Sequence, residues 1–260
     1  MSQPSATPAI GLPFIELQSV DSTNNYARAL IRGEHLPERQ GEARHGMAVF
    51  AQQQTAGKGQ RGKSWEAEKD TGIALSVLLK PGFLGTGQQF QLSATVAVAV
   101  QAFFRKYAGD ETKIKWPNDL YWQDRKAGGI LIENSLSGSG TWEWAIVGIG
   151  ININQTTFPT GLPNPVSLKQ ITGKNFDPLV LAHELIQQLD SAYRMLETAG
   201  FPVIYEQYCT HLYKAGKTCR FKKETRVFEA LVKNVTPEGR LLLQHATEEE
   251  YNFGEIEWVI

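Results

Sequence analysis

The sequence predicts an α+β protein: a larger region of mixed strands and helices, followed by a small appendage built of strands alone. Segments with strand-like and helix-like spacing of apolar residues follow one another as far as residue 212. After Gly216 only short strand-like runs remain, with a turn at Thr236–Gly239 between two of them. Strands mixed with helices, and then strands alone, are typical of an α+β fold with a small antiparallel barrel.

The elements of the larger region follow from its apolar patterning. We expect strands over residues 14–17, 47–51, 73–79, 120–122, 129–132 and 142–149. We expect helices from 22 to 31, 88 to 107, 177 to 196 and 201 to 212. Asp21 and Ser22 are credible caps for the first helix, because their short side chains accept hydrogen bonds from free amides. The Ala/Val-rich run at 94–100 should lie against the sheet.

The chain divides at its changes of composition. The Ser-, Pro- and Ala-rich residues 1–13 are expected to be a flexible tail, without the basic and apolar regions of a signal peptide. Residues 14–214 form the predicted larger domain, which would hold the site. Residues 215–260 form the small β domain, with strands expected over 218–221, 226–235, 240–244 and 255–259.

Composition excludes several classes of protein. A formal net charge of −1 argues against a DNA-binding protein, and the chain has no apolar run long enough to span a membrane. Its two cysteines, Cys209 and Cys219, are too few for a disulfide framework, and its five histidines are scattered without metal-ligand spacing. We therefore expect a cytoplasmic protein that binds neither DNA nor a membrane.

The segment Gly57–Ser64 matches two nucleotide-binding patterns at once. It fits G-x-x-x-x-G-K-[ST], the phosphate loop, and also G-x-G-x-x-G, the dinucleotide fingerprint. Both patterns require a helix directly after the loop. The residues that follow Ser64 carry no apolar stripe, and Gly72 precedes the next strand, so we expect neither fold.

The loop can still bind phosphate groups, although neither of these two nucleotide-binding folds is expected. Its three glycines allow the backbone to approach a ligand closely, and Lys58, Arg61 and Lys63 bring three cations together. Such a loop favours a polyphosphate held between two strands. The alternative from the loop alone is a flexible, solvent-exposed hairpin tip.

Five segments, taken together, carry a resemblance to a known family. In chain order they are Asp21–Asn24, Gln52–Ala56 leading into the glycine loop, Lys115–Leu120, Lys126–Glu133 and Val147–Asn154. They resemble the catalytic domain of biotin protein ligases over residues 14–154, and the C-terminal β segment is similar to the SH3-like domain of that family. The resemblance implies a class II synthetase-like fold, a mixed but largely antiparallel sheet flanked by helices. It also implies the monofunctional type, because about thirteen residues before the first strand cannot hold the winged helix-turn-helix domain of bifunctional relatives.

The resemblance implies a set of biotin-binding residues. They are Ser22, Thr23, Asn24, Gln54, Gly57, Lys58, Gly59, Gln60, Lys126, Gly129 and Gly148. Ser22, Thr23 and Gln54 would contact the neutral ureido head, although Ser22 could serve as a helix cap instead or as well. Gly129 and Gly148 would let the backbone lie against the bicyclic ring, or could simply mark tight strand packing.

The resemblance also implies residues for ATP and for catalysis. The ATP-binding residues would be Lys58, Arg61, Lys63, Trp65, Lys115, Asn118 and Asn152, and the catalytic residues Lys126, Asn118 and Asp119. Lys126 would lie between the biotin carboxylate and the α-phosphate and relieve their repulsion. Asn118 and Asp119 would orient the phosphates, Lys126 or Mg²⁺, which we expect to be held through the substrate phosphates without assigning its protein ligands.

The implied reaction uses biotin and ATP as substrates and has two steps. Biotin first forms biotinyl-5′-AMP with release of pyrophosphate, and a lysine of a biotin carboxyl carrier protein then attacks this anhydride. Neither step needs a protein nucleophile, and the chain shows no Ser–His–Asp or Cys–His arrangement. The family includes homodimers, and the sequence leaves the oligomeric state open.

Two alternatives and one departure accompany this interpretation. A lipoate ligase would share the fold and the adenylation chemistry, and a biotin sensor would have lost catalysis, although Lys126 and the loop cations are retained. The loop departs from the often arginine-rich family pattern because Gln60 carries no charge. We hypothesise that it therefore holds the adenylate less tightly.

Overall fold

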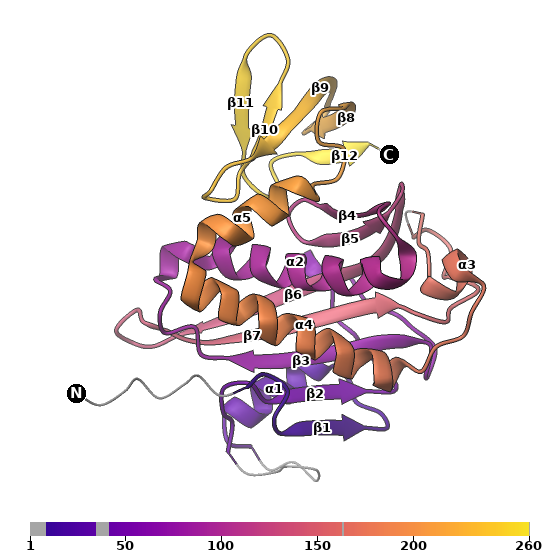
Figure 1. Ribbon diagram of the computed structural model, residues 1–260, viewed down its shortest axis with the longest axis vertical. Helices are drawn as coiled ribbons and strands as arrows, with labels where there is room; N and C mark the ends of the chain where they lie inside the picture. Colours follow the sequence, from indigo (N-terminus) through magenta and orange to yellow (C-terminus); the bar gives the residue numbers. More distant parts are fainter. Residues whose placement is uncertain (1–8, 35–41, 163, 260) are drawn as a thin grey trace.

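A seven-stranded mixed sheet forms the centre of the larger domain (Figure 1). The structure is a computed structural model that describes residues 9–34, 42–162 and 164–259. The strand order is β1-β2-β3-β7-β6-β5-β4. The strands are β1 (Phe14–Leu17), β2 (Ala48–Ala51), β3 (Gly72–Leu79), β4 (Thr112–Lys115), β5 (Asp119–Trp122), β6 (Arg125–Leu136) and β7 (Trp142–Asn152). Only β1 and β2 run parallel, so the predicted mixed and largely antiparallel sheet is confirmed.

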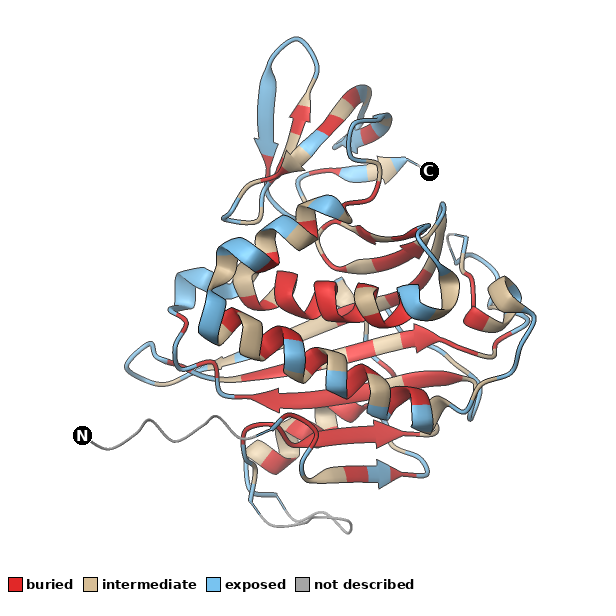
Figure 2. Ribbon diagram, viewed as in Figure 1, coloured by how far each residue is buried: buried red, intermediate tan, exposed pale blue. Residues whose placement is uncertain are grey.

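Helices cover both faces of this sheet. They are α1 (Thr23–Ile31), α2 (Gln89–Ala108), α3 (Leu168–Thr172), α4 (Pro178–Ala199) and α5 (Phe201–Thr210), with short 3-10 turns at Gln60–Gly62 (η1) and Thr86–Gln88 (η2). Alternate residues of β2 point to opposite sides: Ala48 and Phe50 join the core under α2 and α4, whereas Val49 and Ala51 join the core under α1. Because both faces are covered, all four residues of β2 are buried (Figure 2).

The longest helices follow their predicted patterns. The run Ala94–Val100 of α2 is buried throughout, as expected for a segment that lies on the sheet. In α4 the buried positions recur every three or four residues, from Leu181 to Leu196, and Asp177 caps the helix by accepting the amide of Leu179 at 2.8 Å. These two helices pack on each other and on the sheet, where α4 contacts β3 and α2 contacts β4, β5 and β6.

A five-stranded antiparallel sheet forms the C-terminal part, next to α5 (Figure 1). Its order is β11-β10-β9-β8-β12, with β8 (Thr218–Lys223), β9 (Arg226–Val235), β10 (Leu241–Gln244), β11 (Glu248–Tyr251) and β12 (Glu257–Val259). The predicted appendage of strands alone is confirmed. The prediction did not include β11, because Glu248, Glu249 and Glu250 show no apolar alternation and are exposed in an edge strand.

The domain boundaries at 14–214 and 215–260 stay a prediction. Of the predicted tail over 1–13, residues 1–8 lie outside the described part. Ile10 is buried, and its amide donates to Asp190 Oδ1 at 2.8 Å on α4. Within the described ranges, no helix is both long and apolar enough to cross a membrane.

Candidate active site

A cleft of about 770 Å³ lies on the face of the sheet that carries α1. Its walls come from the start of α1, the glycine loop, strands β5 to β7, residues 158–162 with Pro165, and the end of the C-terminal sheet. It brings together most of the residues predicted from the resemblance: Ser22, Thr23, Asn24, Gln54, Lys58, Gly59, Gln60, Arg61, Lys63, Trp65, Lys115, Asp119, Lys126, Gly129, Gly148 and Asn152. Two predicted residues, Gly57 and Asn118, do not line it.

The glycine loop folds back on itself after β2. Trp65 N donates to Gly57 O at 2.8 Å, Gly59 N donates to Lys63 O at 2.6 Å, and Arg61 takes a left-handed backbone conformation. A Cβ on Gly57 would lie 2.3 Å from Trp65 O, so only glycine fits beneath the loop. No helix lies between Ser64 and β3, a stretch that the structure describes in full. The expected exclusion of a phosphate loop and of a dinucleotide fold is confirmed.

Two of the loop's polar side chains are attached to distant parts of the chain. Lys58 Nζ donates to Asn25 Oδ1 at 2.6 Å, on α1. Arg61 lies over the ring of Phe253, 4.7 Å from its centre, and donates to Phe253 O at 3.4 Å. The loop is therefore seated between α1 and the C-terminal sheet, although Lys58 and Arg61 keep exposed surface.

Asn118 lies outside the cleft and is hydrogen-bonded to Gln60 of the glycine loop. Its Oδ1 accepts from Gln60 Nε2 at 2.9 Å, and its Nδ2 donates to Ile130 O at 3.1 Å. The side chain is buried, with 5 % of its surface exposed. Its predicted contact with phosphates stays a prediction, whereas its observed contacts position Gln60.

Neutral polar side chains occupy the floor of the cleft near α1. The amide of Thr23 donates to Gln54 Oε1 at 2.8 Å, and Ser22, Thr23 and Asn24 are all buried. Ser22 stands at the N-cap position, as predicted, but its hydroxyl makes no capping hydrogen bond. The backbone of Ser22 is extended, and the residue lines the cleft. The carboxylate of Asp21 accepts a hydrogen bond from the side chain of Asn25.

Glycines keep the strands below the cleft free of side chains. A Cβ on Gly148 would lie 2.4 Å from Asn24 Oδ1, and one on Gly129 would lie 3.3 Å from Asp119 Oδ1. Gly150 was not predicted; a Cβ there would lie 2.5 Å from the indole ring of Trp65. The two-residue spacing of Gly148 and Gly150 could have indicated that they share one face of β7. Gly129 lies on the same face because it pairs with Gly150 across β6 and β7.

The cation of Lys126 lies beside these glycines. Its Nζ is 2.8 Å from Asp119 Oδ1, and each side chain has 30 % of its surface exposed. Asn152 Nδ2 donates to Lys126 O at 3.4 Å and to Val166 O at 3.1 Å, so it holds the backbone of the lysine. The cleft floor thus has a neutral row near Gly148 and an ion pair near Gly129.

Lys115 is a second cation in the cleft, with an unusual environment. Its Nζ donates to Tyr121 Oη at 3.1 Å and lies 5.6 Å from the centre of the Trp258 ring. The pKa of Lys115 is lowered to about 8, mainly by burial; Asp119 opposes this effect, and Lys126 and Lys63 add to it. In a fraction of the molecules the Lys115 side chain is therefore neutral at slightly alkaline pH.

Sequence reasoning missed the C-terminal wall of the cleft. Phe253, Gly254, Ile256, Glu257 and Trp258 all line it, and Trp116 Nε1 donates to Gly239 O at 2.9 Å to join the two sheets. No local pattern indicated this contact, because it joins segments far apart in the chain.

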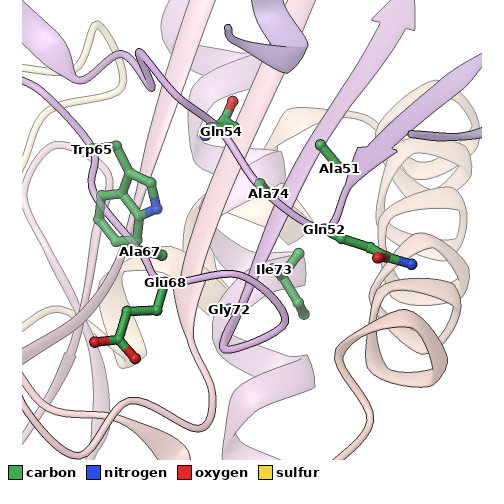
Figure 3. A pocket seen from close by; sticks show the side chains of 9 residues that line it. All are labelled: Ala51, Gln52, Gln54, Trp65, Ala67, Glu68, Gly72, Ile73 and Ala74. Atoms are coloured by element: carbon green, nitrogen blue, oxygen red, sulfur yellow. The ribbon is translucent and has the colours of Figure 1, made fainter. Parts of the chain in front are cut away.

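A small pocket opens beside the cleft and shares Gln54, Trp65 and Ala74 with it (Figure 3). Its volume of about 10 Å³ is room for a single water molecule. The indole of Trp65 lies next to Ala67 in this pocket, and Trp65 lines the main cleft as well.

Sequence comparison places the chain among ligases. The model of the biotin/lipoate A/B protein ligase family matches residues 17–152. The bifunctional ligase/repressor BirA of Escherichia coli (strain K12) is 34 % identical over 187 residues, which span 71 % of this chain and 54 % of that protein. The biotin–[acetyl-CoA-carboxylase] ligase of Paracoccus denitrificans is 30 % identical over 202 residues, which cover 75 % of this chain and 83 % of that protein.

Structural comparison agrees with the sequence. The biotin protein ligase from Aquifex aeolicus in complex with biotin and ATP is 25 % identical, with a TM-score of 0.76, and the match covers 94 % of this chain and 97 % of that one. The predicted fold class, with its C-terminal β domain, is confirmed by this likeness. From the family match and the Paracoccus relative together, this chain belongs to the biotin/lipoate A/B protein ligase family.

Proposed function

We propose that this chain activates biotin with ATP and transfers it to a lysine of a carrier protein. The observation that supports this most is the pairing, on one cleft floor, of a neutral hydrogen-bonding row with the Lys126–Asp119 ion pair. Biotin has a neutral ureido head at one end and a carboxylate at the other, and each end matches one of these features. The glycines of β6 and β7 leave room for the ring system between them.

In the proposed first step, a carboxylate oxygen of biotin attacks the α-phosphorus of ATP. An O–P bond forms, the bond to the bridging oxygen breaks, and pyrophosphate leaves with its electron pair. Lys126 places a fixed cation where two anions must meet, and Asp119 holds that cation in position at 2.8 Å. Mg²⁺ would stabilise the departing pyrophosphate. The carboxylate of Asp119 fits it as a ligand, and the described residues form no group of three or more acidic, histidine or cysteine side chains that could hold it without the phosphates.

In the proposed second step, the amine of a carrier lysine attacks the acyl carbon of biotinyl-5′-AMP. An amide bond forms, the C–O bond to AMP breaks, and the amine loses its proton to solvent or to the departing phosphate. The chain's own contribution is to orient the anhydride and to exclude water. The glycine loop can do this because α1 and Phe253 seat it over the cleft.

The proposal is tested by biotin-dependent exchange of labelled pyrophosphate into ATP, with lipoate as a parallel substrate. We expect exchange with biotin alone, and a loss of at least about a hundredfold in Lys126→Ala, because the fixed charge at the reacting centre is removed. Lys214→Ala is the matched control: Lys214 is also ion-paired, to Asp124 at 2.6 Å with 27 % of its side chain exposed, but it does not line the cleft.

The outcomes separate the alternatives. Exchange with lipoate in place of biotin would assign the chain to the lipoate branch of its family. Biotin binding without any exchange would indicate a sensor and contradict the enzyme proposal. A carrier partner of the biotin carboxyl carrier type belongs to the proposal, while a homodimer, the absence of DNA binding and a cytoplasmic location stay predictions.

A further inference from the structure

A row of hydrogen bonds runs behind the neutral part of the cleft floor and ends on a carboxylate that does not line the cleft. Glu133, on β6, accepts from Asn24 Nδ2 at 2.8 Å through one oxygen and from Arg28 through the other. Asn24 Oδ1 in turn lies 2.6 Å from Ser76 Oγ, on β3. Ser76 is fully buried, and its Oγ also lies 2.7 Å from Thr23 Oγ1.

The direction of this row follows from counting protons. A carboxylate only accepts, so Glu133 draws the amino group of Asn24 toward itself and leaves the carbonyl oxygen facing Ser76. A hydroxyl carries one proton, and that of Ser76 is then used on Asn24 Oδ1. The short contact between Ser76 and Thr23 is a hydrogen bond only if Thr23 is the donor.

This order determines what Thr23 presents to the cleft. Its hydroxyl proton has two acceptors in reach, Ser76 Oγ at 2.7 Å and Gln54 Oε1 at 3.2 Å, and the order of the row assigns it to the nearer one. Only the lone pairs of Thr23 are then left for a ligand. Gln54 Oε1 is already held by the Thr23 amide at 2.8 Å and presents its remaining lone pair. The floor therefore offers acceptors, which suit the N–H groups of a cyclic urea.

We infer that Glu133 is a positioning residue that sets the hydrogen-bond polarity of the cleft floor through Asn24 and Ser76, and so its selectivity for an N–H donor ligand. The inference deepens the proposed function and rests on it. Glu133 acts from outside the cleft and touches no ligand. Its effect reaches the ligand only through the orientation of the Asn24 amide.

The test uses one substitution that reverses the donor-to-acceptor direction of these hydrogen bonds and a second one that restores it. In Glu133→Gln the single carbonyl oxygen goes to Arg28, and the amino group faces Asn24 and turns its amide over. The Ser76 proton then points at Thr23, and the Thr23 proton turns to Gln54 Oε1, 3.2 Å away on the cleft floor. The floor thereby loses an acceptor position for the ligand. In Glu133→Gln with Asn24→Asp, residue 24 accepts on both sides, and the original direction returns.

Affinities for biotin and for ATP, measured by calorimetry on the full chain, distinguish these states. Glu133→Gln should weaken biotin binding about tenfold, the effect of one well-placed hydrogen bond, and leave ATP affinity unchanged. Asn24→Asp alone should also weaken it, because two carboxylates then face each other. The double variant should recover to within about threefold of the original chain. Glu143→Gln, an exposed glutamate on the adjoining β7, is the control and should bind as before.

Two results would overturn the inference. One is unchanged biotin affinity in Glu133→Gln, and the other is a double variant no better than Glu133→Gln alone, which would reduce Glu133 to a structural ion pair with Arg28. Thermal unfolding of each variant shows whether a loss of affinity is a loss of folding. An original chain that does not bind biotin would overturn the proposed function itself, which separates the two failures.

Discussion

ATP binding should weaken as pH rises, because the ammonium of Lys115 loses its proton in the free protein. Its pKa is lowered to about 8 by burial, with Lys126 and Lys63 adding to the effect and Asp119 opposing it. A bound polyphosphate would favour the charged form and raise this pKa toward its ordinary value of 10.5. Above a pH of about 8, Lys115 is mostly neutral in the free protein and must take up a proton when ATP binds. The affinity for ATP therefore falls as the pH rises.

The magnitude follows from linkage between the two pKa values. With the free group near 8 and the bound group near 10.5, the affinity for ATP should fall about twentyfold between about pH 7.5 and about pH 9.5. The fall should approach one factor of ten per pH unit in the upper half of this range. The phosphates of ATP do not titrate there, so the change reports the protein.

Calorimetric titration with ATP across this pH range measures the effect, and two variants assign it. Lys115→Arg should give a nearly flat profile, because a guanidinium keeps its charge throughout the range. Lys115→Met should bind weakly at every pH. A flat profile for the original chain, or an undiminished slope in Lys115→Arg, would refute the assignment.

Two further predictions concern the glycine loop. Gly254→Ala should lower the free energy of unfolding by about 1–2 kcal/mol, because Gly254 has a positive φ and its new Cβ would lie 1.2 Å from Arg61 Nη2 and expel that side chain from Phe253. Thermal unfolding checks this, and an unchanged midpoint would contradict it. Gln60→Arg should slow release of biotinyl-5′-AMP about tenfold, because an arginine can add a charge-assisted hydrogen bond to the phosphate. Dissociation rates of the isolated adenylate complex measure it, and equal rates would show that Gln60 does not limit retention.

Most elements of the fold were predictable, because their apolar spacing is regular. The predicted helix at 88–107 corresponds to α2 at Gln89–Ala108, and the strand at 226–235 to β9. The prediction lacked β4 and α3. Thr112–Lys115 is an edge strand with two lysines, and β5 is its one neighbour in the sheet order. Leu168–Thr172 is too short to show a helical period.

The candidate site was predictable at positions where the residue type itself indicates the role, such as a glycine, a neutral polar residue or a cation. Glycines at 129 and 148, the neutral residues at 22–24 and the cation at 126 all line the cleft. The positions of Asn118 and Gly57 behind the loop were not predictable. Both follow from backbone groups that only the folded chain brings near, Ile130 O for Asn118 and Trp65 O for Gly57.

The sequence by itself determined which chemical groups this protein has available: a basic glycine loop, neutral polar residues at the start of α1, and glycines in strands where a ligand can lie. Only the tertiary structure decided what each group touches. Arg61 lies on Phe253, 192 residues away, and Glu133 orients Asn24 from 109 residues away. Spacing along the chain constrains neighbours within a helix or strand, whereas partners across the fold depend on how whole elements pack, and no local pattern records that.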